Sequence, residues 1–256
     1  MERDPTGRFV ALLANAHRIM VFTGAGVSTG SGIPDFRGPD GVWKTRHPVL
    51  YDDFLNSEAA RVEYWEWKQE GRARIRDAAP NAAHYACVRL EEAGRLEAVV
   101  TQNVDGLHEA AGISRGRLVE LHGTDARVTC LSCEKEAPLE ECFASFETTG
   151  RPPSCACGGF LKPATISFGQ ALRSDDLERA ALAAEGCDLA VSLGSTLSVH
   201  PAAGFPLQAA RRGAPYVVIN RGVTDHDALS AVTLRLEGDV VEIFPPAVER
   251  ALSAAG

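Results

Sequence analysis

The chain has 256 residues, which suits one α/β domain with a small insertion. Its net charge of −8 argues against a nucleic-acid-binding surface, and no apolar run approaches the roughly 20 residues of a membrane-spanning helix. The N-terminal residues MERDPTGRF lack the apolar segment of a secretory signal, so the seven cysteines point to a reducing compartment. We therefore expect a cytoplasmic protein that binds neither nucleic acid nor membrane.

A short amphipathic helix over residues 6–16 and a buried strand over residues 19–22 lead into a glycine-rich loop. Glycine lets the backbone take positive φ and lets a ligand approach the chain closely. A turn of this kind after a parallel strand exposes backbone N–H groups that can bind a pyrophosphate. The loop therefore favours a dinucleotide site, and its first residues are Gly24, Ala25 and Gly26.

The loop departs from the common G-x-G-x-x-G fingerprint of dinucleotide sites. Its third glycine, Gly30, comes one position late, and Pro34 interrupts any long helix. On glycine spacing alone, an ordinary strand and turn is the alternative. A polar, aromatic and cationic trio on the following loop has little structural purpose and favours a functional site. The trio is Asp35, Phe36 and Arg37.

Residues 47–77 are rich in charged and aromatic residues, and Tyr64, Trp65 and Trp67 fall on a predicted helix. The spacing favours packing within a small helical module, and the alternative is that one of the rings lines a substrate or cofactor cleft. A second helix is predicted over residues 81–93, and Gly94 ends it.

Functional side chains follow two predicted strands. The strand over residues 118–121 ends at His122, and the strand over residues 96–101 is followed by Gln102, Asn103, Val104 and Asp105. In open parallel sheets, ligands bind beyond the carboxyl ends of the strands. Amide and acid side chains there can orient ribose hydroxyls and a carboxamide, and an imidazole with a pKa of about 6.5 suits a general base. An ordinary polar loop and a structural histidine are the alternatives.

Four cysteines form two closely spaced pairs, separated by a charged segment of little regularity. Thiolates at such spacing on tight turns can bind one Zn²⁺ tetrahedrally, and four cysteines with no open position describe a structural ion. Two unconnected thiol pairs are the alternative. The predicted ligands are Cys130, Cys133, Cys155 and Cys157. The other cysteines, expected in the core or at the surface, are Cys87, Cys142 and Cys187.

After the cysteines, residues 162–170 are expected to be extended, and the chain then returns to alternating strands and helices. Such alternation predicts a parallel, doubly wound, Rossmann-like sheet of the α/β class. Strand ends of the second half would hold an adenosine through Gly194, Ser195 and Asn220. The predicted strands span residues 188–193, 216–219 and 233–236, and the predicted helices span residues 201–212 and 240–254.

Three motifs occur in one order along the chain: GAGVSTGSGIPDFRG from Gly24, TQNVDGLH from Thr101 and LHG from Leu121. Together they resemble the signatures of the sirtuins, NAD-dependent protein deacylases, and the chain is similar to a single-domain, bacterial-type member. The resemblance implies a Rossmann-like NAD-binding domain over residues 1–46, 78–124 and 165–256. It also implies a small lobe made of a helical module, residues 47–77, and a zinc-ribbon module, residues 125–164.

The same resemblance assigns ligands to residues of this chain. The pyrophosphate and its ribose would be held by Gly24, Ala25, Gly26, Asp35, Phe36 and Arg37. Nicotinamide and its ribose would be held by Gln102, Asn103, Val104 and Asp105. The adenosine end would be held by Gly194, Ser195, Asn220 and Val240. An acyl-lysine peptide would pair, by β-augmentation, with the backbone of Ile166, Ser167, Phe168 and Gly169.

The implied reaction removes an acyl group from a protein lysine and consumes NAD. The substrate amide oxygen attacks the nicotinamide ribose as nicotinamide leaves. No protein nucleophile is then needed, which agrees with a sequence that shows no Ser/His/Asp or Cys/His pattern. By resemblance, His122 is the general base, Asn103 is the second catalytic residue, and the products are nicotinamide, O-acyl-ADP-ribose and free lysine. The zinc would be structural, and the chain is expected to be a monomer.

Four positions depart from the family pattern. The second cysteine pair is C-x-C, Ser195 and Thr196 reverse the frequent Thr-Ser order, and Gln170 stands where many sirtuins have Glu. In the desuccinylating branch, a Tyr and an Arg three residues later bind an acidic acyl group. Here Trp67 is read at the Arg position, so we expect acetyl or longer neutral acyl chains in preference to succinyl.

Three other functions are compatible with parts of the pattern. An NAD-dependent dehydrogenase would keep the tighter glycine fingerprint and would need no four-cysteine insertion. A zinc-ribbon module that binds NAD without turnover would not require Asn103, Asp105 and His122 together. Mono-ADP-ribosyl transfer onto protein begins with the same loss of nicotinamide, so the motifs barely separate it from deacylation.

Overall fold

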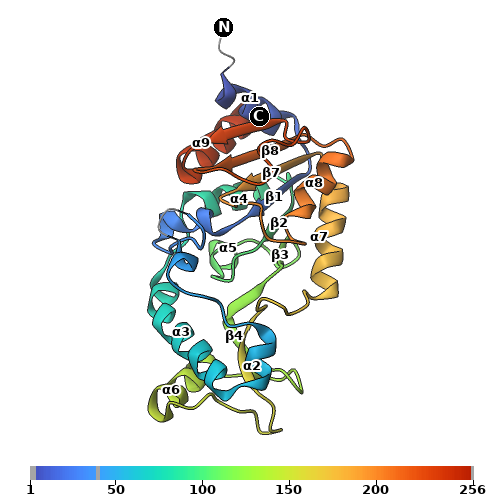
Figure 1. The fold of residues 1–256 in the computed structure, drawn as a ribbon. Helices are drawn as coiled ribbons and strands as arrows, with labels where there is room; N and C mark the ends of the chain where they lie inside the picture. Colours follow the sequence, from blue (N-terminus) through green and yellow to red (C-terminus); the bar gives the residue numbers. More distant parts are fainter. Residues whose placement is uncertain (1–3, 39–40, 255–256) are drawn as a thin grey trace.

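The computed structural model describes residues 4–38 and 41–254, so Pro39 and Asp40, which follow the predicted trio, lie outside it. In this part of the chain the strands form a six-stranded parallel sheet and a three-stranded antiparallel sheet. Figure 1 shows the parallel sheet with its helices in the upper part of the molecule and the antiparallel sheet in the lower part. No helix among the described residues is long and apolar enough to cross a membrane.

The strands of the parallel sheet are β1 (Ile19–Thr23), β2 (Leu96–Thr101), β3 (Leu118–Glu120), β7 (Leu189–Leu193), β8 (Tyr216–Asn220) and β9 (Leu234–Glu237). Their order is β3-β2-β1-β7-β8-β9, and every neighbouring pair is parallel. The chain builds outward from β1 to β3, returns to β7 beside β1 and continues to β9. This order places a topological switch point between β1 and β7, where open parallel sheets bind ligands.

Helices cover both faces of the parallel sheet because the strands are apolar on both sides. Alternate residues of β1 enter different cores: Val21 clusters with Phe244, and Phe22 clusters with Phe205 on the other face. One face is covered by α1 (Pro5–Asn15), α4 (Ala82–Glu92) and α9 (Val240–Ala254). The other face is covered by α7 (Ser174–Gly186) and α8 (Gly204–Arg211). The predicted α/β, Rossmann-like class is confirmed.

The antiparallel sheet has the order β5-β4-β6, with β4 (Gly123–Cys130), β5 (Glu136–Ala137) and β6 (Leu161–Thr165). The helices around it are α2 (Tyr51–Asn56), α3 (Glu58–Asp77) and α6 (Leu139–Thr149). The Ser57 hydroxyl accepts the Ala60 N–H at 3.2 Å and so starts α3. Aromatic rings fill the core, where the centroids of Trp65 and Phe143 are 5.1 Å apart. The prediction that the aromatic residues of 47–77 pack within a helical module is therefore confirmed for Trp65.

Short elements connect these parts: α5 (Leu107–Ala111) and the 3₁₀ turns η1 (Ala25–Val27), η2 (Thr29–Ser31) and η3 (Val42–Lys44). The expectation of an irregular segment between the cysteine pairs was wrong, because that segment contains α6. The apolar residues Cys142, Phe143 and Phe146 recur there at helical spacing and are buried. Glutamates flank these residues on both sides, so the charged composition hides the helical pattern.

The predicted extension of residues 162–170 was also wrong beyond Thr165. Strand β6 ends there, and a turn follows in which the Gln170 N–H donates to the Ser167 carbonyl at 3.0 Å. Gly169, at φ +85°, supplies the left-handed backbone that this turn needs. The helix predicted over residues 201–212 begins later, at Gly204, because a turn closed by the Pro201 carbonyl precedes it.

Two buried histidines pack against each other under the parallel sheet. The ring centroids of His84 and His108 are 4.8 Å apart. The Asn81 N–H donates to Nδ1 of His84 at 3.2 Å in a capping box, which holds the His84 ring neutral. Burial lowers the pKa of His84 to about 4 and is the main cause that lowers the pKa of His108 well below 6.5, and repulsion between the two rings when both are protonated lowers the His108 pKa further.

These pKa values predict that acid destabilises the fold. The unfolded chain protonates His84 at the ordinary pKa of 6.5, but the folded chain resists protonation down to about pH 4. The free energy of unfolding should therefore fall as the pH decreases from 6.5 toward about 4, by roughly 3 kcal/mol from this residue. Urea unfolding at several pH values measures the slope. In His84→Gln, which keeps a capping acceptor without titrating, the slope should be smaller, and an equal slope would contradict the assignment.

Candidate active site

A cleft of about 1130 Å³ opens at the switch point between β1 and β7 and extends to the antiparallel sheet. Its walls are the loops after β1, β2, β7 and β8, the residues after β6 and the start of α9. Every residue predicted to hold NAD or the peptide lines this cleft except Asp105, and His122 lines it as well. The residues that the strand-end argument singles out therefore come together at one cleft.

The cleft floor is the contact between the loops after β1 and β7. The Gly26 N–H donates to the Gly194 carbonyl at 2.8 Å. A Cβ on Gly26 would lie 2.7 Å from the Gly194 Cα, and a Cβ on Gly194, at φ +61°, would lie 2.4 Å from the Gly26 carbonyl carbon. Glycine at both positions is what lets the loops touch, and the floor is left as bare backbone. Such a floor fits a pyrophosphate.

Asp35 shapes the loop that carries the cationic wall. Its Oδ1 accepts the Gly38 N–H at 2.6 Å, and its carbonyl accepts the Val42 N–H at 3.1 Å. These bonds close a tight turn that keeps Phe36 and Arg37 on the cleft wall. The Arg37 guanidinium, next to a floor of bare backbone, is suited to binding the two phosphates of a dinucleotide.

Asn103 is held in one orientation behind the floor. Its Nδ2 donates to the Gly24 carbonyl and to the Ser28 hydroxyl, both at 3.2 Å, and its side chain is buried. The Ser28 hydroxyl in turn donates to Oδ2 of Asp105 at 2.7 Å. Burial raises the pKa of Asp105, against the hydrogen bonds from the Leu107 N–H and from Ser28, which lower it. Asp105 thus supports the site from behind the cleft surface.

His122 lies between the two sheets, after β3 and before β4. Its Nδ1 is 3.0 Å from the Gln102 carbonyl, which can only accept, so in the neutral ring Nδ1 carries the proton and Nε2 is the base. Its own carbonyl accepts the Ile166 N–H at 2.8 Å. Burial lowers the pKa of His122, the Gln102 hydrogen bond opposes this, and the Arg37 charge lowers it further. The net pKa lies below the ordinary 6.5.

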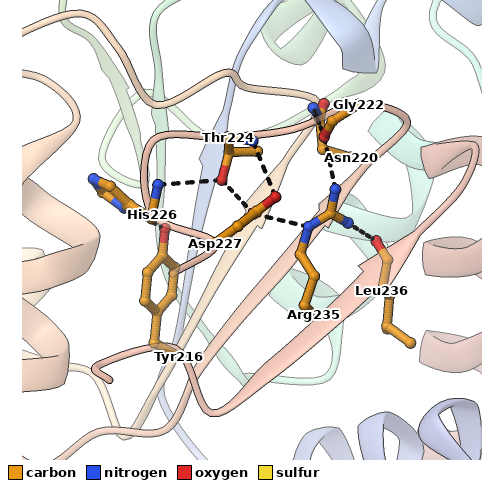
Figure 2. Close-up of polar contacts among 8 residues, drawn as sticks. All are labelled: Tyr216, Asn220, Gly222, Thr224, His226, Asp227, Arg235 and Leu236. Atoms are coloured by element: carbon orange, nitrogen blue, oxygen red, sulfur yellow. Dashed lines mark hydrogen bonds and ion pairs between the residues drawn. The ribbon is translucent and has the colours of Figure 1, made fainter. Parts of the chain in front are cut away.

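At the far end of the cleft, a polar network fixes the loop after β8 (Figure 2). The Asn220 amide and the Arg235 guanidinium both donate to the Gly222 carbonyl, at 2.9 and 2.7 Å. Arg235 Nε also donates to Oδ1 of Asp227 at 2.9 Å, and Oδ2 of Asp227 accepts the Thr224 N–H at 3.1 Å. Arg235 and Asp227 therefore hold the stretch that presents Asn220 and Gly222 to the cleft.

Another wall of the cleft is the turn that follows β6. Its Phe168 carbonyl accepts the Tyr51 N–H at 2.9 Å, which ties the turn to the start of α2. The side-chain oxygen of Gln170 accepts the Ser167 N–H at 3.1 Å. Gln170 thus shapes the rim of the cleft through its amide oxygen.

The four cysteines predicted as metal ligands come together at one end of the antiparallel sheet. All four Sγ atoms lie within 4.8 Å of one another. Two of the Sγ–Sγ distances, Cys130–Cys157 and Cys133–Cys155, are 3.5 and 3.7 Å. Tetrahedral Zn²⁺ with Zn–S bonds of about 2.3 Å sets its sulfurs about 3.8 Å apart, so the cluster fits one structural zinc ion. A Cβ on Gly159 would lie 2.7 Å from Cys130 Sγ, so glycine at this position lets the turn after the C-x-C pair approach Cys130 closely.

The Sir2 family model matches residues 24–201 of this chain. The chain belongs to the Sir2 family. The resemblance predicted from its motifs is therefore confirmed. Among its relatives, the NAD-dependent protein deacetylase of Rhodopseudomonas palustris is 41% identical over 238 residues, which cover 93% of each chain.

Solved Sir2 structures share the whole fold. A Sir2 variant with a deacetylated peptide and 3′-O-acetyl-ADP-ribose is 36% identical, with a TM-score of 0.86, over 97% of this chain and 98% of that one. A Sir2 protein with a peptide and NAD⁺ is 35% identical, with a TM-score of 0.85, over 100% of this chain and 99% of that one. The parallel sheet and the cysteine-bearing small lobe are thus the Sir2 arrangement.

Some residues of the Sir2 cleft escaped the motif-based prediction. Ser28 joins Asn103 to Asp105, and its place inside the first motif was the available signal. Lys68 of α3 lines the cleft beside Tyr64 and Trp67, so the alternative reading, that an aromatic ring of residues 47–77 lines a cleft, holds for these two rings. Asp227 and Arg235 lie off the motifs and act only through the folded loop, which no spacing rule marks.

Proposed function

We propose that this chain removes acetyl groups from protein lysines in a reaction that consumes NAD and releases nicotinamide and O-acetyl-ADP-ribose. The observation that carries the proposal is one cleft in which the Gly26–Gly194 floor lies together with Asn103 and the half-buried base His122. The curated relatives and the solved Sir2 complexes support it. The enzyme is thus an NAD-dependent protein deacetylase, and NAD is its cosubstrate.

In this proposal NAD lies along the cleft. The pyrophosphate and its ribose are held by the glycine floor with Gly24, Ala25, Gly26, Asp35, Phe36 and Arg37. The nicotinamide end is held by Gln102, Asn103, Val104 and, from behind, Asp105. The adenosine end is held by Gly194, Ser195, Asn220 and Val240. When bound, NAD supplies an electrophilic ribose carbon and takes up the acyl group.

The residues around that carbon have separate tasks. Asn103, fixed by Gly24 and Ser28, orients the nicotinamide ribose. His122 accepts a proton from a ribose hydroxyl at Nε2, because its Nδ1–H is committed to the Gln102 carbonyl. The substrate amide oxygen is the nucleophile, so the enzyme itself needs none.

The lowered pKa of His122 predicts the acidic limb of the pH profile. The base works only in its neutral form, and burial with the nearby Arg37 charge keeps the ring neutral below the ordinary pKa of 6.5. We expect kcat/KM for the deacetylation to fall on the acidic side with a midpoint below pH 6.5. Initial rates across pH 5 to 8 at subsaturating substrate measure this. A midpoint above 6.5 would contradict the assignment.

Loosening the loop after β8 should weaken NAD binding selectively. Arg235→Met removes the bonds to Gly222 and Asp227, so we expect KM for NAD to rise about 5- to 10-fold with kcat nearly unchanged. Arg212→Met, at an exposed arginine, is the matched control and should leave both constants unchanged. A fall in kcat without a change in KM would show that the network acts elsewhere.

The acyl-lysine peptide lies against Ile166, Ser167, Phe168 and Gly169, which line the cleft. The Rossmann-like domain comprises residues 1–46, 78–124 and 165–256, and residues 47–77 and 125–164 form the small lobe. The chain acts as a monomer in the cytoplasm, where reducing conditions keep the four thiolates available for zinc.

Mass spectrometry of an acetyl-lysine peptide incubated with the purified protein, with and without NAD, tests the function. We expect NAD-dependent loss of acetyl, matched by nicotinamide and O-acetyl-ADP-ribose. Consumption of NAD with an intact acetyl-peptide and ADP-ribose bound to protein would favour ADP-ribosyl transfer. No consumption of NAD would refute an enzymatic role.

A further inference from the structure

The cleft wall contains a buried ion pair that the mechanism above does not use. Lys68 of α3 lines the cleft with Tyr64 and Trp67, and its Nζ lies 2.6 Å from Oδ1 of Asp125 on β4. The two side chains are only 10% and 11% exposed. Nζ of Lys68 also lies 5.1 Å from the Trp67 ring centroid and 5.6 Å from that of Tyr64. Solvent therefore screens the pair weakly.

This ion pair is tied to the catalytic and peptide-binding segments from both sides. Asp125 follows His122 by three positions, and its N–H donates to the Val104 carbonyl at 2.8 Å. On the α3 side, the Tyr64 hydroxyl lies 2.9 Å from Oγ1 of Thr165, the residue directly before the peptide-binding turn. An acyl chain carried into the cleft by a lysine would therefore meet this wall.

We propose that Asp125 sets the acyl preference by neutralising Lys68, so that the cleft accepts neutral acyl chains and rejects those that end in a carboxylate. The inference rests on the proposed deacylation. An acidic chain would have to displace Asp125 from Lys68 or stay beside it unpaired, and both cost desolvation free energy. Although burial opposes it, Asp125 raises the pKa of Lys68, which keeps the pair ionised. The preference expected from Trp67 thus acquires a second cause.

A second lysine shows what the carboxylate balances. Lys162 is 1% exposed, its Nζ lies 5.1 Å from the Tyr64 ring centroid, and it donates to the carbonyls of Pro163 and Thr165. Two lysines therefore lie near the Tyr64 ring, and Asp125 forms its ion pair with Lys68. Without the Asp125 charge, Lys68 would be an unpaired cation on the cleft wall, with a second lysine near the same Tyr64 ring.

The test compares a succinyl-lysine peptide with its uncharged amide, the succinamoyl-lysine peptide, which has the same length. Wild type should turn over the amide at least about tenfold faster, measured as kcat/KM. Asp125→Asn, of the same shape, frees Lys68 and should lower that ratio at least about tenfold, with deacetylation retained. Adding Lys68→Met to Asp125→Asn removes the freed cation and should restore the wild-type ratio.

Several results would overturn the inference. Equal rates on the two peptides in wild type would do so without any variant, even if Asp125→Asn failed to fold. An unchanged ratio in folded Asp125→Asn, or a lowered ratio that persists in the double variant, would do so as well. Deacetylation of an acetyl-lysine peptide is measured in every protein. Its absence in wild type would refute the proposed function, whereas its presence with an unchanged ratio refutes this inference alone.

Discussion

His122→Ala is expected to lower kcat/KM for deacetylation by about 100- to 10,000-fold, the usual contribution of a positioned general base. The substitution removes an imidazole on the cleft wall whose Nδ1 is committed to a backbone carbonyl and whose Nε2 can accept a proton. Rates of acetyl-peptide consumption, followed by mass spectrometry at saturating NAD, give the magnitude. Binding of NAD, measured by calorimetry, should change little, because the floor and the Asn103 network do not depend on the His122 side chain.

A matched histidine control is available. His17 is exposed at the end of α1, away from the cleft, and His17→Ala should leave the rate unchanged. Rapid nicotinamide exchange is a second readout, because that step precedes proton transfer to His122 and should survive the substitution better than net deacetylation. If His122→Ala kept its rate within tenfold of wild type, a different group would have to be the base.

Cys133→Ala is expected to abolish zinc binding and to unfold the small lobe. Structural zinc contributes about 10 kcal/mol or more to the folding of zinc-finger peptides, and this antiparallel sheet has only two residues in β5. Elemental analysis should find one zinc per wild-type chain and none in the variant. Activity should fall with it, since His122 is anchored to the residue that follows β6.

Cys142→Ala provides the matched control for the metal. Cys142 lies in α6 of the same lobe and is buried, but it is outside the four-thiolate cluster. Its substitution should cost some packing free energy while zinc content stays at one per chain. A wild-type protein that retained its fold and activity after a strong chelator had removed the metal would contradict a structural role.

The sequence located most of the cleft because the cleft sits at strand ends. Gln102, Asn103 and His122 directly follow apolar runs that read as strands, and parallel strands bring their carboxyl ends to one edge. The same logic correctly placed the glycines after β1 and β7. The four cysteines could be assigned because two closely spaced pairs of thiolates can place four sulfur ligands around one ion. Motif resemblance then supplied the identity of the ligand.

What the sequence could not supply depends on contacts between distant segments. The pairing of Lys68 with Asp125 joins α3 to β4, and neither residue carries a motif. The motif comparison assigns Trp67 to the position that contacts the acyl group and gives no role to the neighbouring Lys68. The turn after Thr165 was missed because its extended-looking composition conceals one glycine at positive φ. Such features arise from tertiary packing, which local patterns do not encode.

The glycine contact on the cleft floor has a consequence for how the protein is made. Gly26 belongs to the first third of the chain and Gly194 to the last third, so ribosomal synthesis delivers the two halves of the floor at different times. Until β7 has emerged and docked beside β1, the loop after β1 lacks its packing partner, the loop after β7. A nascent or C-terminally truncated chain can therefore carry the complete glycine motif and still have no affinity for a dinucleotide.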